Sequence, residues 1–124
     1  MSDIQIIFGQ VPRKSNSYKI VSRRGVDGKI HGSLAKTEAL DKYEKSFYLQ
    51  CDKYRNKQIK GLFQLDLKVY YSSQRPDLDN ALKIILDCLQ NCNAIINDRQ
   101  CVKITAEKFV DKSNARIEFK IITV

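Results

Sequence analysis

Residues 75–89 constrain this chain more than any other stretch, because they combine a helix start, an apolar face and closely spaced acids. Pro76 disfavours helical geometry at the residue before it, so we expect a helix that begins after Pro76 with Asp77 at or near its N-cap. Apolar side chains at helical spacing then predict one buried face, made of Leu78, Leu82, Ile85 and Leu89.

The charged residues of the same helix have two interpretations. Asp79, Lys83 and Asp87 recur at every fourth position, so they should meet on one face. In the structural interpretation, the aspartates stabilise the helix N-terminus, where free amides and the helix dipole favour negative charge, and Lys83 pairs with Asp79 or Asp87. In the functional interpretation, Asp77 and Asp79 converge beyond the helix end and bind a cation. The spacing alone is compatible with both.

Two short motifs lie within residues 75–102, and they read Asp77-x-Asp79-Asn80-x-x-Lys83 and Asn97-Asp98-Arg99-Gln100. With the apolar helix between them, they resemble the RusA family of Holliday-junction resolvases, which are metal-dependent endonucleases. The order and lengths of the flanking elements fit a resemblance over the whole chain. Two positions depart from the family pattern: Asn97 stands where the family often has a second acid, and Cys92-Asn93-Ala94 stands where it often has a glycine.

The resemblance implies a site of three carboxylates, in which Asp77, Asp79 and Asp98 bind Mg²⁺, with Mn²⁺ as a substitute and no small-molecule cofactor. Asp98 would join the other two through the fold. Mg²⁺ favours hard oxygen ligands, which suit the aspartates better than the thiols of this chain. Lys83 would contact the scissile phosphate or the charge of the transition state. The resemblance also implies a branched DNA substrate, a four-way junction cut by paired incisions, and a homodimer that carries two sites.

Positive charge is concentrated in the first half of the chain. The formal net charge is +8, and residues 1–60 hold 13 basic and 6 acidic side chains, whereas residues 61–124 hold 9 and 8. A basic half beside clustered acids suits an enzyme that attracts a polyanion, and an acid-free basic stretch predicts an arm that contacts phosphates. A solvated loop without a ligand gives the same pattern. The expected nucleic-acid contacts are Arg13, Lys14, Lys19, Arg23 and Arg24 in the arm, with Arg75 and Arg99 beside the acidic motifs.

The hydrophobic periodicity predicts an α+β fold in which residues 1–124 form a single domain, with a mixed β-sheet, two main helices and a C-terminal β-hairpin. The longer helix should lie within residues 33–57, and its apolar stripe predicts core positions at Leu40, Tyr43, Phe47, Cys51 and Tyr54. The expected strands are a first strand over residues 4–8, a short hairpin around residues 25–28, a clear strand over residues 63–71, and a final hairpin of residues 101–110 and 115–124 across residues 111–114.

Membrane and zinc-binding classes are not favoured by the sequence. No apolar run approaches membrane-spanning length and the N-terminus lacks a signal-peptide pattern, so we expect a cytoplasmic protein without membrane contact. The four cysteines include no Cys-x-x-Cys, and the only histidine, His31, is remote in sequence, which favours reduced thiols over a zinc site. The resemblance places the protein in a bacterium or a phage.

One expected function and two alternatives follow from these patterns. The expected function is that of a Mg²⁺-dependent, structure-selective endodeoxyribonuclease that resolves Holliday junctions in DNA recombination and repair. The first alternative is a non-catalytic basic DNA-binding protein in which the acids only cap a helix. The second is a metal-dependent nuclease that acts on other nucleic acids, RNA included.

Overall fold

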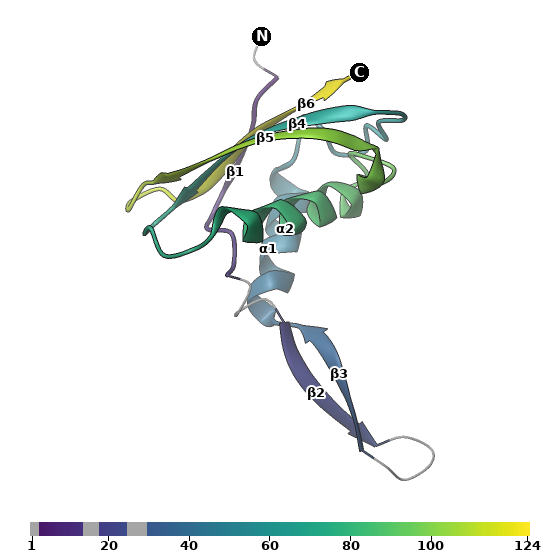
Figure 1. Cartoon of the computed structure of the whole chain (residues 1–124), viewed down its shortest axis with the longest axis vertical. Helices are drawn as coiled ribbons and strands as arrows, with labels where there is room; N and C mark the ends of the chain where they lie inside the picture. The colour runs from purple at the N-terminus through teal and green to yellow at the C-terminus, as the bar shows by residue number, and fades with distance from the viewer. Residues whose placement is uncertain (1–2, 14–17, 25–29) are drawn as a thin grey trace.

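A four-stranded sheet with two helices against one of its faces forms the body of the structure, and a two-stranded hairpin projects from this body (Figure 1). The structure, a computed structural model, describes residues 3–13, 18–24 and 30–124, with the side chains of residues 3–13 and 36–124. The expected α+β fold with a mixed sheet and two main helices is confirmed. Within the described ranges, no helix is long and apolar enough to cross a membrane.

The body sheet contains β1 (Gln5–Phe8), β4 (Phe63–Tyr71), β5 (Cys101–Val110) and β6 (Arg116–Thr123), in the order β1-β6-β4-β5. The central strand β4 pairs antiparallel with β6 and parallel with β5, and β1 pairs antiparallel with β6. The first strand and the strand over residues 63–71 are therefore confirmed. β4 occupies the centre because alternate apolar side chains along it are buried, namely Phe63, Leu65, Leu67, Val69 and Tyr71.

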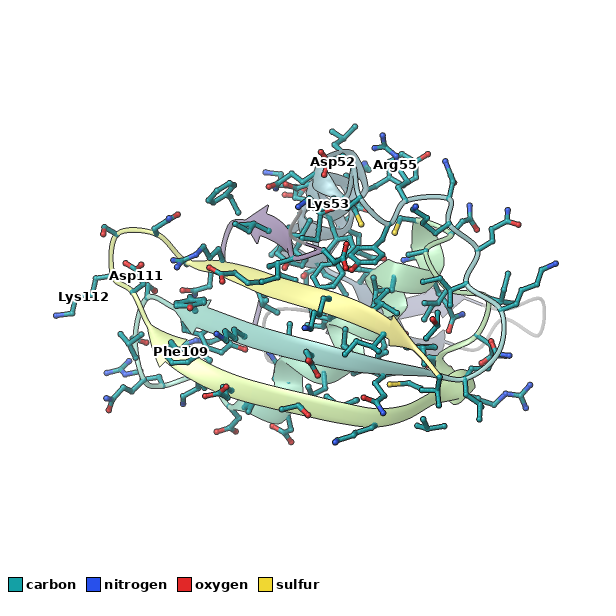
Figure 2. The ribbon with its side chains drawn as sticks, turned by 90° about the horizontal axis from the view of Figure 1, so that it is seen from above. Asp52, Lys53, Arg55, Phe109, Asp111 and Lys112 are labelled. Carbon is teal, nitrogen blue, oxygen red and sulfur yellow. The ribbon has the colours of Figure 1, made fainter. Side chains whose placement is uncertain are left out.

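The predicted C-terminal β-hairpin is wrong, because β4 lies between the two final strands. β5 has no fully buried side chain and forms an edge, whereas β6 buries alternate apolar residues beside β4. The turn from β5 to β6 is tied to the central strand, since the Asp111 amide donates to the Tyr71 carbonyl at 2.8 Å. On the open face, the guanidinium of Arg116 lies 3.8 Å from the ring centroid of Tyr70, and this ring stacks on Phe109 at 4.9 Å. Figure 2 shows Phe109 and Asp111 at one end of the sheet.

The helices α1 (Glu38–Gln50) and α2 (Leu78–Asn91) cover the inner face of the sheet (Figure 1). α2 begins where the sequence predicts, with Asp77 as its N-cap. The predicted buried face of α2 is confirmed at Ile85 and Leu89, whereas Leu78 and Leu82 are only partly buried. The full buried face is shifted toward Ala81, Ile84 and Cys88.

The helix predicted within residues 33–57 is real but shorter than expected. α1 has 13 residues against 14 in α2, so it is not the longer helix. It starts only after Thr37, because the preceding residues pair as a strand, and it ends before Asn56 and Gln58, whose φ values of 64° and 48° are not helical. The predicted core stripe is confirmed, since five side chains are buried there: Leu40, Tyr43, Phe47, Cys51 and Tyr54.

The projecting hairpin, which we call the arm, consists of β2 (Tyr18–Arg24) and β3 (Ile30–Lys36). The two strands pair antiparallel with each other, which confirms the predicted hairpin and extends it. The arm points away from the sheet and lies beyond the start of α1 (Figure 1). The predicted turn over residues 25–28 lies outside the described residues.

The edge strand β1 exposes apolar side chains on the open face of the sheet. Ile6 and Phe8 are 38% and 54% exposed, whereas the neighbouring Gln5 is buried. The Gln5 amide group donates to the Gln50 carbonyl at 3.0 Å, and its oxygen accepts from the Lys53 amide at 2.8 Å. This buried polar side chain therefore fastens β1 to the end of α1.

Candidate active site

The carboxylate of Asp77 makes no capping hydrogen bond, although Asp77 is the N-cap residue of α2. The other helix starts use their cap side chains: the Thr37 hydroxyl accepts from the Leu40 amide at 3.3 Å, and the Asn97 side chain accepts from the Arg99 amide at 2.9 Å. An N-cap aspartate normally accepts a hydrogen bond from the first turn. The Asp77 carboxylate is therefore available for another partner.

Asp77 and Asp79 both act on the buried hydroxyl of Tyr71, at the end of β4. Burial raises the pKa of Tyr71, a hydrogen bond with the Asn80 side chain opposes this shift, and the charges of Asp77 and Asp79 raise the pKa further. The Tyr71 hydroxyl also donates to the Asp77 carbonyl at 3.4 Å. Among the described side chains, no Lys or Arg forms an ion pair with either aspartate. The start of α2 thus carries two neighbouring carboxylates for which the described side chains supply no ion-pair partner.

Asp98 opens a short 3₁₀ turn, η2 (Asp98–Gln100), directly before β5. Its amide donates to the Gln90 side chain at 2.9 Å, which ties Asp98 to the last turn of α2. Asn97, at the position where the family often has a second acid, caps this turn through the Arg99 amide. The substitution therefore leaves the backbone that presents Asp98 well supported.

The structure brings Asp77 and Asp79 together, but it places Asp98 at the opposite end of α2 (Figure 1). In the described part of the chain, no three His, Cys, Asp or Glu side chains form a group that could hold a metal ion. A single copy of the chain therefore does not assemble the expected three-carboxylate site. The role of Asp98 as a metal ligand stays a prediction.

Lys83 pairs with Asp87 at 3.3 Å, and its side chain is 72% exposed. This is one of the two ion pairs that the structural interpretation predicts. The contact is an exposed pair one turn apart on a helix, which contributes only about 0.3–0.5 kcal/mol. The pair is therefore weak enough for Lys83 to exchange Asp87 for a phosphate.

The predicted nucleic-acid contacts are spread over the arm and the two ends of α2. Arg75 and Arg99 are exposed, and each lies two residues or fewer from a predicted metal ligand. Arg13 is partly buried and is the last described residue before the arm. The backbone of β2 carries Lys19, Arg23 and Arg24, whose side chains are not described, and Lys14 lies outside the described residues.

Lys108 was not predicted from the sequence, yet it holds the loop that delivers Asp77. Its ammonium group donates to the carbonyl oxygens of Gln74 and Pro76, both at 2.9 Å. The partners lie more than 30 residues earlier in the chain, on a segment that only the sheet brings close. No local sequence pattern marks such a contact.

The segment at the base of the arm is also attached to the candidate site. The Gln10 side chain accepts from the Ser72 amide at 2.9 Å, and the Asn80 side chain donates to the Pro12 carbonyl at 2.9 Å. The sequence marks Asn80 only as a member of the motif Asp77-x-Asp79-Asn80-x-x-Lys83. These contacts connect residues 10–12, which precede the arm in sequence, to both sides of Asp77.

The two clustered aspartates fit a divalent metal ion such as Mg²⁺. They supply hard oxygen ligands from a rigid helix start, and Mg²⁺ is commonly held by one or two carboxylates with waters and substrate phosphate. The four cysteines are free thiols and three of them are buried. Burial raises the pKa of Cys88, so this thiol stays protonated and is a poor ligand.

No curated protein sequence matches the chain. A family model does match, and it covers residues 12–122, which include the arm, both helices and every predicted ligand. The matching family is described as endodeoxyribonuclease RusA. The chain therefore belongs to the RusA family of endodeoxyribonucleases, whose members resolve Holliday junctions.

Proposed function

We propose that this protein is a Mg²⁺-dependent endodeoxyribonuclease that resolves four-way DNA junctions by paired incisions, in recombination and repair. Family membership supports nuclease activity. One observation supports the assignment of this activity to particular residues. Asp77 occupies the N-cap position of α2, but its carboxylate does not cap the helix. A side chain that only stabilised the helix would make that hydrogen bond.

The proposed metal ligands are Asp77, Asp79 and Asp98, with Mn²⁺ as a substitute for Mg²⁺ and no small-molecule cofactor. Bound Mg²⁺ would supply activation of water and stabilisation of the negative charge on the phosphate oxygens. Asp77 and Asp79 would hold the ion at the start of α2, where the helix dipole also favours the approach of a phosphate. Lys83, one turn later, would contact the scissile phosphate when DNA is bound.

The proposed DNA contacts lie on both sides of this site. Arg75 and Arg99 are exposed beside the predicted ligands and would bind nearby phosphates. The arm would contact a more distant part of the junction, because it projects from the body (Figure 1). The proposed contacts in this region are Arg13 and Lys14, which precede the arm in sequence, and Lys19, Arg23 and Arg24 on β2.

We further propose that the protein acts as a homodimer on branched DNA in the cytoplasm. A four-way junction has two symmetry-related strands to cut, and one chain carries one pair of clustered carboxylates. A two-fold dimer would present two equivalent sites to these strands.

The test compares Asp77→Asn with the parental protein on a four-way junction in Mg²⁺. Loss of a group that organises transition-state charge typically lowers the rate about 100-fold or more, and we expect at least this loss with an unchanged Tm. Junction binding in metal-free buffer should be equal or tighter, because a negative charge is removed. Asp41→Asn, which changes a first-turn acid of α1 that pairs with Lys45, is the control and should cut normally.

Three outcomes distinguish the alternatives. Parental cutting by folded Asp77→Asn would show that the charge of this acid is not needed for catalysis. Junction binding by the parental protein without Mg²⁺-dependent cutting would favour a non-catalytic DNA-binding protein. Equal cutting of linear RNA would favour a nuclease with broader substrates.

A further inference from the structure

Cys51 and Cys92 end the two helices that cover the sheet, and their side chains meet. Cys51 is the C-cap residue of α1, and Cys92 is the C-cap residue of α2. The Cys51 thiol donates a hydrogen bond to the Cys92 sulfur. Both cysteines are free thiols, and neither belongs to the proposed metal site. The helix ends therefore hold a pair of neighbouring sulfur atoms that the proposed function does not use.

The backbone around the two cysteines keeps the sulfur atoms close together. The Asn56 amide donates to the Cys92 carbonyl at 3.0 Å, and the Ile59 amide donates to the Ala94 carbonyl at 2.9 Å. The segment after Cys51 thus runs beside the segment that starts at Cys92. Since a cysteine side chain is short, these main-chain contacts fix the position of both thiols.

The hydrogen bond between the thiols gives the two sulfur atoms different properties. It lowers the pKa of Cys92, because the Cys51 thiol donates to the Cys92 sulfur and stabilises its thiolate. The same hydrogen bond raises the pKa of Cys51, and burial raises it further. In cysteine oxidation the thiolate is the nucleophile, and a neighbouring thiol converts the first product into a disulfide. Cys92 is therefore suited to attack an oxidant, and Cys51 is suited to complete the disulfide.

The other two cysteines have different surroundings. Burial raises the pKa of Cys88, and the charge of Glu44 raises it further. Burial also raises the pKa of Cys101, whose thiol donates to the Lys103 carbonyl at 3.6 Å. A protonated thiol is a poor nucleophile, so neither side chain should react with an oxidant in the folded protein. Cys88 and Cys101 are therefore internal controls for the reactivity of the pair.

The pair lies directly beneath the molecular surface, although both cysteines are fully buried. Asp52 and Asn93, which follow them in sequence, are exposed. The loop after α1 contacts the pair, since the backbone of Tyr54 and Arg55 hydrogen-bonds to the Cys51 sulfur. Figure 2 shows Asp52 and Arg55 of this loop at the margin of the molecule. A small oxidant therefore has to pass only this loop to reach the sulfur atoms.

This loop and the segment opposite it contain unfavourable backbone conformations. In the described part of the chain, the residues other than glycine with positive φ are Asn56 at 64°, Gln58 at 48° and Asn93 at 59°. Such strained, exposed segments open locally more readily than helices packed on a sheet. Local opening should admit hydrogen peroxide, which is little larger than water, without unfolding of the whole domain.

We propose that Cys51 and Cys92 are an oxidation site, at which hydrogen peroxide converts the thiol pair into a disulfide that joins the ends of α1 and α2. The Cys92 thiolate attacks one peroxide oxygen and the O–O bond breaks. The departing hydroxide takes up the proton that Cys92 released, which leaves water and a sulfenic acid. The Cys51 sulfur then attacks the Cys92 sulfur, the S–O bond breaks, and a second water leaves with the Cys51 proton. Two thiols are oxidised, and one peroxide is reduced to two waters.

The disulfide would brace the two helix ends against each other. It closes a loop of about 40 residues, and a cross-link of this length restricts the unfolded chain. We therefore expect the Tm of the oxidised protein to rise by about 5 °C or more. A reducing compartment keeps the pair as thiols, so the bond forms under oxidant and a dithiol reductant reverses it.

Peroxide treatment of the full-length, metal-free protein in native buffer tests this proposal. The protein is reduced, freed of reductant, exposed to hydrogen peroxide and alkylated, and a non-reducing digest is analysed by mass spectrometry. We expect a single disulfide-linked peptide pair, which contains Cys51 and Cys92. Cys88 and Cys101 should be recovered in alkylated form. Dithiothreitol should restore four free thiols and the Tm of the reduced protein.

Cys88→Ala is the matched control, because Cys88 lies one turn before Cys92 and is almost equally buried. This variant should form the disulfide at the parental rate, whereas Cys51→Ala and Cys92→Ala should form none and keep the Tm of their reduced forms. Peptide analysis of the parental protein decides the outcome even where a variant does not fold.

Two results would overturn the oxidation site. One is recovery of alkylated Cys51 and Cys92 after a treatment that fully oxidises glutathione in a parallel sample. The other is a disulfide that includes Cys88 or Cys101 in the folded parental protein.

Discussion

The ammonium group of Lys108 lies 2.9 Å from the carbonyl oxygen of Pro76, the residue directly before Asp77. A second hydrogen bond of 2.9 Å joins it to Gln74 in the same loop. Lys108 stands near the end of β5, and Asp98 opens the 3₁₀ turn that directly precedes this strand. We therefore infer that Lys108 acts as a positioning residue for Asp77.

Replacing Lys108 by Met should loosen the loop of residues 72–77 and leave the fold intact. Hydrogen bonds to a charged group contribute about 1.5–3 kcal/mol, so hydrogen exchange of the loop amides should accelerate about tenfold or more. Mn²⁺ binding should weaken, whereas Lys108→Arg should largely restore it, because Arg also donates to carbonyls. Lys103→Met removes the same charge from β5 and is the control. Unchanged loop exchange in Lys108→Met would show that the two hydrogen bonds do not position Asp77.

A substitution of Lys83 separates its ion pair from its proposed contact with DNA. Lys83→Ala should lower junction cutting by roughly 10-fold to 100-fold, as is typical for loss of a charge-stabilising group, without tighter binding. Asp87→Asn breaks the same ion pair and keeps the lysine, so it should cut normally. Single-turnover cleavage measures both variants. If both variants lost the same cutting activity, loss of the ion pair would explain the effect, and Lys83 would have no separate contact with DNA.

Most elements of the fold were predictable because their signals are local. The alternation of buried and exposed residues from Phe63 to Tyr71 specifies β4, and Pro76 with Asp77 specifies the start of α2. The order of strands in the sheet was not predictable in the same way. A short turn over residues 111–114 favours a hairpin, yet the more apolar β4 takes the position between β5 and β6.

The candidate site was predictable as a set of residues but not as an arrangement. The motif identifies Asp77, Asp79 and Asp98, because their residue types and order carry the resemblance. Their positions depend on the parallel pairing of β4 with β5, which joins residues about 40 apart in sequence and leaves Asp98 at the far end. Lys108 was not predicted from the sequence for the same reason, since its hydrogen bonds to Gln74 and Pro76 form only in the folded sheet.

The arm should contribute to the salt dependence of DNA binding. Arg23→Ala with Arg24→Ala removes two proposed phosphate contacts, so the slope of log affinity against log salt should fall by about one to two units. Lys42→Ala with Lys45→Ala removes two exposed charges from α1 and is the control. Fluorescence anisotropy of a labelled junction, in metal-free buffer across a salt series, measures both. An equal slope in the arm variant and the parental protein would assign this stretch to the solvated surface.

Ile104→Lys should dissociate the dimer if the two copies pair through β5. Lysine side chains on edge strands disfavour pairing with another strand. Two-fold symmetry would also bring the two added charges toward each other. We expect the dimer dissociation constant to rise at least about tenfold, since unfavourable cross-strand pairs cost up to about 1 kcal/mol in each of two symmetry-related positions. Analytical ultracentrifugation measures this constant. Ile6→Lys is the matched control, as Ile6 has nearly the same exposure, 38% against 37%, but lies on the other edge strand, β1. A dimer that resists Ile104→Lys and dissociates with Ile6→Lys would place the contact on β1 and the open face of the sheet instead.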